Sequence, residues 1–261
     1  MPTLTLLDKL YGAGHPETFE KLYSDILGGL EVTLRFVGTT KRGWIQLDVY
    51  GEDQTVAINL LKQEIGLAPN SLYDLKTSPV TKGKVIFSNK SQNELTVDLG
   101  VSSPTVVGAA LSKKTLQAQL SDGKNIELPT LVELFCLYDN LPLEVRIGDY
   151  NDETKTVDTT LSEAQLSLFT NWVQCRFDRM IVLGSFLSDV EHAVKKSKSF
   201  RDIIKTESLG TLEQVVVCKL GTDAVGLIPK IGRYLKSAVL VPFSPKKVLK
   251  TIGSESFDWK L

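Results

Sequence analysis

Apolar positions in the first 78 residues alternate between strand-like and helix-like spacing. Strand-like alternation marks the first, third and fourth of five segments, and helical spacing marks the second and fifth. In chain order the five segments are residues 3–7, 16–27, 32–36, 45–49 and 54–65. Pro16 suits the first turn of a helix, Asp53 can cap the next one, and a short strand near Leu72–Leu75 is expected to close the unit. This order predicts a ferredoxin-like βαββα(β) unit over residues 1–78.

Short strands and turns replace this pattern in the next part of the chain, residues 79–160. The strand-like runs are residues 83–87, 94–99, 116–120 and 143–147. Several short strands at this spacing predict a small closed β-barrel. The polar segment Asn151–Thr160 is expected to be a linker or an exposed loop.

The segment KGKVIFSNKSQNELTVDLG, residues 82–100, places a G-x-V strand before a V-D-x-G strand. In this it resembles the start of an S1-type OB-fold, a family of RNA-binding barrels. Polar residues 88–93 stand where that family has a glycine and an aromatic residue. The resemblance implies a central OB/S1-like β-barrel over residues 79–160.

The last part of the chain, residues 161–261, begins with a helix for which Ser162 is the expected cap. Strands and helices then follow in the order βαββαβ. The strands are expected at residues 180–184, 202–209, 214–220 and 238–241, with one helix opening at Ser188 and another at Thr222 or Asp223. This order predicts a second, C-terminal ferredoxin-like unit. The fold class is therefore α+β: a ferredoxin-like unit, a central barrel and another ferredoxin-like unit.

Several stretches of the chain resemble an archaeal protein family of unknown function. They are CRFDRMIVLG, VEHAVKKS, RDIIKTESLGTLEQVVVCKLGTDAVGLIPKIGR, VPFSPKKVL, GEDQTVAINLLKQEIG and LVELFCLYDNLPLEVRI. The resemblance covers essentially the whole chain. It implies an archaeal cytoplasmic protein and brings no activity with it.

The composition argues against a metal centre, a disulfide framework and a membrane protein. The three cysteines, Cys136, Cys175 and Cys218, form no CxxC pair, and the two histidines, His15 and His192, lie far apart in sequence. A zinc site or another cofactor is therefore not expected, and free thiols suit a reducing cytoplasm. The apolar runs are too short to span a bilayer, and the amino terminus does not resemble a secretion signal.

Candidate catalytic groups are isolated. Neither histidine lies in a recognisable motif, and Asp178, Glu207 and Asp223 are single carboxylates of an unspecific kind. We therefore expect no catalytic residues and a protein that is more plausibly a binding protein than an enzyme.

Charge is distributed unevenly along the chain. Residues 1–171 hold 15 Lys and Arg against 22 Asp and Glu, a net charge of −7, whereas residues 172–261 hold 15 against 9, a net charge of +6. A basic end can bind an anion such as RNA, although oppositely charged parts of a chain can also simply attract each other. The candidate RNA contacts are Lys195, Lys196, Lys198, Arg201, Lys246, Lys247 and Lys250, with Lys82, Lys84 and Phe87 on the barrel. The alternatives are a solvated basic face and, for Phe87, a place in the core.

Two loops rich in glycine and hydroxyl groups follow the first and third strands of the C-terminal unit. If these strands are adjacent and parallel, their loops converge and can hold a phosphate between two helix amino termini. The residues concerned are Gly184, Ser185, Ser188, Lys219, Gly221, Thr222, Asp223 and Gly226. The alternative is that they are only helix caps and tight turns.

The preferred functional hypothesis is a non-catalytic RNA-binding protein of translation or RNA processing. A second hypothesis is a protein–protein adaptor that docks on the ribosome, RNA polymerase or an RNA-processing complex. A third is a regulator that binds a nucleotide or another phosphate ligand in the two loops.

Overall fold

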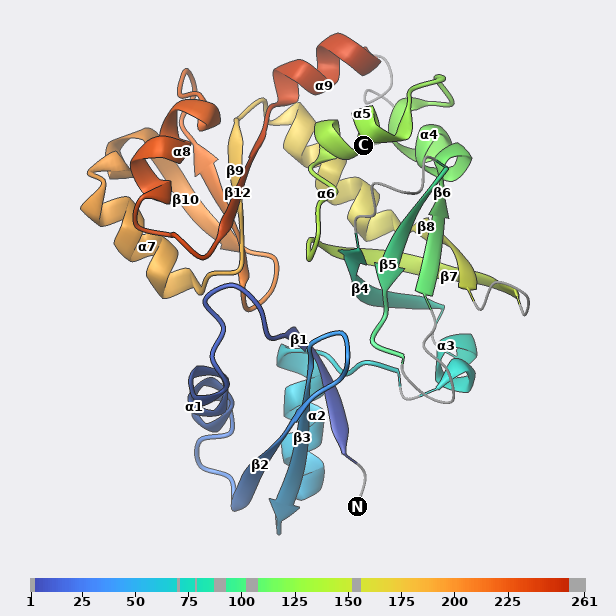
Figure 1. Cartoon of the computed structure of the whole chain (residues 1–261), viewed down its shortest axis with the longest axis vertical. Coiled ribbons are helices and arrows are strands. Elements are labelled where there is room, and N and C mark those ends of the chain that lie inside the picture. Colours follow the sequence, from blue (N-terminus) through green and yellow to red (C-terminus); the bar gives the residue numbers. More distant parts are fainter. Residues whose placement is uncertain are drawn as a thin grey trace.

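The computed structural model describes residues 3–69, 71–77, 79–86, 93–101, 108–151 and 156–253. These residues form a mixed α+β fold in which a three-stranded sheet, a closed barrel and a four-stranded sheet surround a common junction (Figure 1). We call the three parts the N-terminal unit, the barrel and the C-terminal unit. Among the described residues no helix is both long and apolar enough to cross a membrane.

The N-terminal unit packs two helices on an antiparallel sheet with the strand order β1-β3-β2. Its elements are β1 (Leu4–Lys9), α1 (Pro16–Ile26), β2 (Val32–Thr39), β3 (Trp44–Gly51) and α2 (Gln54–Glu64). Alternate residues of β1 and β3 point into a core that includes Leu6 and Leu47. Leu212 of the C-terminal unit is buried in the same core.

The strand expected near Leu72–Leu75 is wrong, because that segment forms the short helix α3 (Leu72–Thr77). Ser71 and Asp74 explain the helix: the Ser71 amide donates to the Asp74 carboxylate at 3.1 Å, and the Asp74 amide donates to the Ser71 hydroxyl at 3.3 Å. Such reciprocal bonds satisfy the free amides at the start of a helix. Before α3 the chain pairs with β1 at an isolated bridge between Leu6 and Leu67.

The closed barrel expected from the sequence is confirmed. Its strands follow the order β4-β5-β6-β8-β7, and all their pairings are antiparallel except that between β6 and β8. The elements of this region are β4 (Val80–Ile86), β5 (Glu94–Asp98), β6 (Gly108–Ser112), α4 (Lys113–Ser121), α5 (Leu128–Phe135), β7 (Pro142–Asn151) and β8 (Thr156–Leu161).

Two expectations for the barrel region are wrong. The run Leu116–Leu120 lies in helix α4, where Ser112 caps the Thr115 amide at 3.1 Å and two leucines four residues apart are buried on one side. The segment expected to be a linker contains strand β8, whose alternate residues Val157 and Thr159 are buried. The Thr159 hydroxyl donates to a carbonyl of β6 at 3.0 Å, which makes a polar side chain compatible with this buried position.

The C-terminal unit has the expected element order βαββαβ. Its sheet order is β10-β11-β9-β12, and every neighbouring pair is antiparallel. The elements are β9 (Arg179–Leu183), α7 (Leu187–Lys196), the 3-10 helix η1 (Ser199–Asp202), β10 (Ile203–Ser208), β11 (Glu213–Cys218), α8 (Ala224–Gly232) and β12 (Val239–Phe243).

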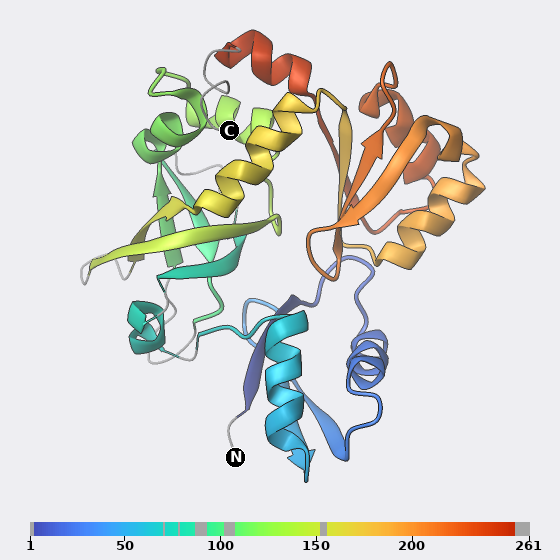
Figure 2. The ribbon, with the colours of Figure 1, turned by 180° about the vertical axis from the view of Figure 1, so that it is seen from behind.

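Apolar residues cover both faces of the central strands of this sheet. Met180 and Val182 face α7 and α8, whereas Ile181 and Leu183 join the core of the barrel. Helices α6 (Glu163–Gln174) and α9 (Pro245–Ile252) complete that joint core, and Figure 2 shows α6 lying across the barrel.

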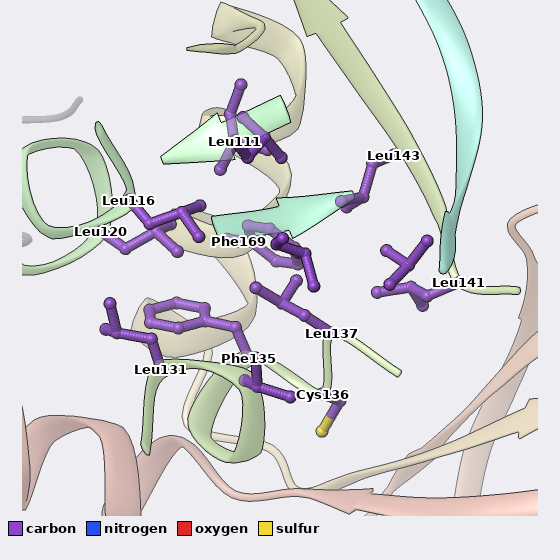
Figure 3. Close-up of a cluster of buried hydrophobic side chains, with 14 of the residues drawn as sticks. Leu111, Leu116, Leu120, Leu131, Phe135, Cys136, Leu137, Leu141, Leu143 and Phe169 are labelled. Atoms are coloured by element: carbon purple, nitrogen blue, oxygen red, sulfur yellow. The ribbon is translucent and has the colours of Figure 1, made fainter. Parts of the chain in front are cut away.

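Aromatic side chains continue the joint core from the barrel to the sheet. The ring centroids of Phe135 and Phe169 lie 5.4 Å apart, those of Phe169 and Trp172 5.7 Å, and those of Trp172 and Phe243 5.3 Å. Figure 3 shows Phe135 and Phe169 among the leucines of this core. The barrel and the C-terminal unit therefore share one apolar core.

The N-terminal unit approaches the C-terminal unit backbone to backbone. The Ala13 amide donates to the Gly184 carbonyl at 2.8 Å. Gly12 has φ +61°, and a Cβ atom there would lie 2.4 Å from the same carbonyl oxygen. Glycine at position 12 is therefore required both by its backbone conformation and by this contact.

The contact between Gly12 and Gly184 can be measured by comparing two glycine substitutions. Gly123 has a similar φ, +74°, but its Cβ position is open. We expect Gly12→Ala to lower the free energy of unfolding by about 2 kcal/mol more than Gly123→Ala, since only the first adds a steric clash. Urea denaturation of both variants checks this, and equal losses would contradict the close approach of the two units.

Candidate functional site

A cavity of about 560 Å³ lies where the three units meet. Its walls come from β1, α1 and α2 of the N-terminal unit, from β4 of the barrel, and from the start of α7 and the turn between β10 and β11. This volume is typical of small-molecule sites. The polar side chains that line it are Asp8, Trp44, Glu64, Lys82, Lys84, Ser188, Ser208, Thr211, Glu213 and Gln214.

Glu213, the first residue of β11, is fully buried beside the cavity. Its Oε1 accepts a hydrogen bond from the Lys84 ammonium at 2.7 Å and another from the Tyr11 hydroxyl. Its Oε2 has no hydrogen-bond partner among the described atoms. A Cβ atom on Gly210 would lie 2.3 Å from this oxygen, so the glycine leaves the space that the carboxylate occupies.

Asp8 is a second buried carboxylate on the cavity wall, with 3% of its surface exposed. Its Oδ2 accepts from the Tyr23 hydroxyl and the Thr211 hydroxyl, each at 2.9 Å. Burial raises the pKa of Asp8; the nearby Lys84 ammonium acts in the opposite direction, and Glu213 adds to the rise. Asp8, Glu213 and Lys84 together carry a net charge of −1 when all three are ionised.

A second buried ion pair lies beside Trp44. Lys9 and Asp98 are paired at 2.8 Å, and Arg42 reaches Asp98 at 3.3 Å. The Lys9 ammonium lies 4.5 Å from the centre of the Trp44 ring. The indole Nε1 of Trp44, a residue 1% exposed, has no hydrogen-bond partner among the described atoms. The two ion pairs therefore link the N-terminal unit to the barrel and the barrel to the C-terminal unit.

The strand pattern contains a weak signal for these residues. Asp8 occupies the next alternate position after Leu4 and Leu6, so it continues the inward-facing side of β1. Glu213 begins a strand that is buried at every position. A charged residue at an inward-facing position is a candidate for a buried site, but which charges meet depends on the packing of the units.

The expected loop at Gly184–Ser188 is occupied by contacts within the protein. The amides of Gly184 and Ser185 both donate to the Leu212 carbonyl, at 2.8 and 3.0 Å. The cap of α7 is Phe186, so the expected cap at Ser188 is wrong. Ser188 is exposed and lines the cavity between the three units, whereas the sequence predicted it as the cap of a helix in a phosphate-binding loop.

The second loop does not meet the first. Strands β9 and β11 are antiparallel, so the loops that follow them leave opposite ends of the sheet, and the expected convergence is wrong. Each crossover helix joins strands that run in the same direction but are separated by an antiparallel strand. Asp223 caps α8 by accepting a hydrogen bond from the Val225 amide at 3.0 Å. This agrees with the alternative that the loop residues are helix caps and tight turns. The remaining residues of this loop lie near the same end of α8: Lys219, Gly221, Thr222 and Gly226.

The structure places the expected RNA contacts in several separate regions. Those near the end of α7 are exposed: Lys195, Lys196, Lys198 and Arg201. Lys246, Lys247 and Lys250 lie on α9, and all three are exposed. Helix α7 covers one face of the C-terminal sheet, whereas α9 contacts α5 and α6 beyond the end of that sheet, so the two basic groups lie on separate helices (Figure 1).

The candidate contacts on the barrel differ in exposure. Lys82 is exposed and lines the cavity, but Lys84 is 4% exposed and is paired with Glu213. Lys84 was expected from the sequence to be a surface contact for RNA, but it is not available on the surface of the barrel. Phe87 lies outside the described residues.

The described part of the chain contains no group of three or more His, Cys, Asp or Glu side chains that could hold a metal ion. Cys136 and Cys218 are buried free thiols, and Cys175 is an exposed one. Besides lysines and hydroxyl groups, the cavity is lined by carboxylates, an amide and an indole.

The burial of Asp8 predicts a pH-dependent cost. Unfolded aspartate ionises near its ordinary pKa, whereas the raised pKa of Asp8 makes ionisation in the folded state less favourable, so stability is lost as the pH rises between the two values. Asn at this position cannot ionise and can still accept from Tyr23 and Thr211. We expect Asp8→Asn to stabilise the protein, and the gain to grow as the pH rises from about 4, where an unfolded aspartate ionises.

Thermal unfolding of the wild type and Asp8→Asn over this pH range measures the effect. Asp158→Asn, an exposed substitution on β8, controls for the loss of one negative charge. Asp8 is surrounded by Lys84, Glu213 and Tyr23. A gain in stability for Asp8→Asn that is the same at all pH values would contradict the proposed cost of ionising Asp8 in these surroundings.

Two family models match the chain on either side of the barrel. Residues 3–71 match the DUF2110 N-terminal domain and residues 177–242 match the DUF2110 C-terminal domain. No curated protein matches the chain. The two matches contain the N-terminal and C-terminal walls of the cavity, including Asp8 and Glu213. They cover 69 and 66 of the 261 residues, just over half of the chain, which therefore belongs to the DUF2110 family.

Proposed function

We propose that this protein is a non-catalytic binding protein that holds a small molecule in the cavity between its three units. The observation that carries the proposal is Glu213, a fully buried carboxylate whose Oε2 has no partner among the described atoms and which lines the cavity. A buried carboxylate oxygen without a hydrogen bond is costly. A ligand that donates a hydrogen bond to this oxygen removes that cost.

The position of the cavity supports a regulatory role for such a ligand. Each unit supplies part of the wall, so a molecule bound there contacts all three at once. Binding to the assembled form stabilises that arrangement relative to any form in which the units separate. The proposed function is therefore that of a ligand sensor or carrier whose bound state is the more rigid one.

A substitution that fills the cavity tests this proposal. Leu187, the first residue of α7, lines the cavity and is 38% exposed, whereas Val225 near the start of α8 is 50% exposed and does not line it. We expect Leu187→Trp to abolish binding, and Val225→Trp to preserve it, when a mixture of amino acids, polyamines, nucleosides and nucleotides is screened by ligand-detected NMR. The reason is that only the first indole occupies the space of the ligand.

Two results of this screen would contradict the proposal. The first is that no member of the mixture binds the wild type. The second is that every molecule that binds the wild type also binds Leu187→Trp equally well.

RNA binding is a second candidate function, favoured by the strand order of the barrel. We propose that this barrel is of the OB type, because a closed five-stranded barrel with the order β4-β5-β6-β8-β7 has the strand arrangement of that fold. OB-type barrels bind single strands. We also propose that the flanking units are ferredoxin-like, in line with their βαββα and βαββαβ orders, and that the protein is cytoplasmic, in line with its free cysteines.

The basic residues near the end of α7 test the RNA proposal. We expect Lys195→Glu with Lys196→Glu to abolish the retention of single-stranded RNA on filters at low salt, and wild-type retention to fall as salt rises, because lysine contacts to phosphates release counterions. Lys21→Glu with Lys62→Glu makes the same change in charge on exposed positions of the N-terminal unit and serves as the control. Salt-independent retention, or equal losses in both double variants, would remove this candidate.

A further inference from the structure

We infer that the cavity selects an organic cation with at least one N–H bond, carried on an apolar body. This inference rests on the proposed small-molecule function and specifies the chemistry of its ligand. The charges, the unpaired acceptors and the apolar walls each contribute to it.

The charges around the cavity favour a cation. Asp8 and Glu213 are both buried, and only one buried ammonium, that of Lys84, faces them among the described lining residues. Lys84 is 2.7 Å from Glu213, so its charge is already paired. When Asp8 is ionised, a bound cation compensates the remaining negative charge, whereas an anion would add a third negative group to a poorly solvated place.

The unpaired atoms favour a hydrogen-bond donor. Two buried side-chain acceptors on the cavity wall, Glu213 Oε2 and Gln214 Oε1, have no partner among the described atoms. Because the two residues are successive on β11, their side chains leave opposite faces of the strand, and we assign the contact with the ligand to Glu213. An ammonium or guanidinium group on Glu213 Oε2 would form a charge-assisted hydrogen bond. A quaternary ammonium has no N–H to donate.

A metal cation is a poorer fit than an organic one. The described residues contain no cluster of three potential ligands, and one oxygen of each carboxylate is already occupied by donors from the protein. Calcium and magnesium bind through several oxygen ligands. The exposed Lys82 and the start of α7 lie on the rim, where they can contact an anionic tail but do not offset Asp8 and Glu213 in the interior.

Apolar walls complete the site. Six half-buried residues face the cavity from the three units: Leu7, Leu22, Ile26, Ile65, Pro142 and Phe186. Such walls gain from burial of a hydrocarbon portion of a ligand. The site is therefore suited to an amine with an aliphatic or aromatic body.

Three probes that share a hexyl chain and differ only in the head group test this inference: hexylamine, hexanol and heptanoate. The indole N–H signal of Trp44, assigned by Trp44→Phe, reports binding because this unpaired group lines the cavity, and Trp172 in the joint core serves as an internal reference. At matched pH and ionic strength we expect hexylamine to shift the Trp44 signal with at least about tenfold higher affinity than either of the other probes.

Glu213→Gln gives the matched variant. It keeps the shape of the side chain and removes one negative charge, so the preference for hexylamine over hexanol should fall at least about tenfold. Glu207→Gln on β10 does not line the cavity and should keep the preference. If Glu213→Gln does not fold, Asp8→Asn removes the same charge from the cluster and is expected to lose the preference as well.

The results distinguish failure of the cation inference from failure of the proposed small-molecule function. Equal or tighter binding of heptanoate or hexanol at Trp44 would overturn the cation inference and leave a small-molecule cavity in place. The absence of any hexylamine shift would overturn it too, while the screen with Leu187→Trp decides whether another molecule occupies the cavity.

Discussion

The ion pair between Lys84 and Glu213 is the interaction on which the arrangement of this molecule depends. Lys84 comes from the barrel and Glu213 from the C-terminal unit, and the Tyr11 hydroxyl of the N-terminal unit donates to the same carboxylate. All three units thus meet at one buried side chain. Removal of one member of a buried pair is strongly destabilising, by about 3–5 kcal/mol, because the other charge is left without compensation. The position of Glu213 therefore constrains the geometry of the cavity beside it.

The other connections between the units differ in kind. The barrel and the C-terminal unit share a continuous apolar core, to which α6 and α9 both contribute. The N-terminal unit has a separate core, and it is joined to the barrel by the Lys9–Asp98 pair and to the C-terminal unit by backbone contacts at Gly12. Attachment of the N-terminal unit therefore combines charge and hydrogen bonds with apolar burial, because Leu212 of the C-terminal unit lies in its core and Phe186 packs against it.

The sequence predicted the local elements better than their assembly. Helix α1 begins at Pro16 as expected, and the βαββαβ order of the C-terminal unit follows from spacing within short windows. The strand predicted at Leu116–Leu120 is wrong because two leucines four residues apart also suit a helix. Strand β8 was predicted as a linker or an exposed loop because the threonines of this buried strand resemble the composition of a polar loop. Lys84 and Glu213 lie 129 residues apart, and only packing of complete units brings them together. No spacing rule links such residues, so the sequence could not predict the cavity.

The helix α9 has a consequence for how the chain can be divided. It follows the last strand of the C-terminal sheet and returns to the barrel side, where Val248 and Ile252 are buried in the same core as Leu95 and Leu111. The core that opens with the barrel strands is thus completed only by the final described helix. During synthesis, part of the apolar surface of the barrel therefore stays uncovered until the C-terminal unit and α9 have been made. The C-terminal unit is therefore better described as an insertion between α6 and α9 than as a domain appended to a finished barrel.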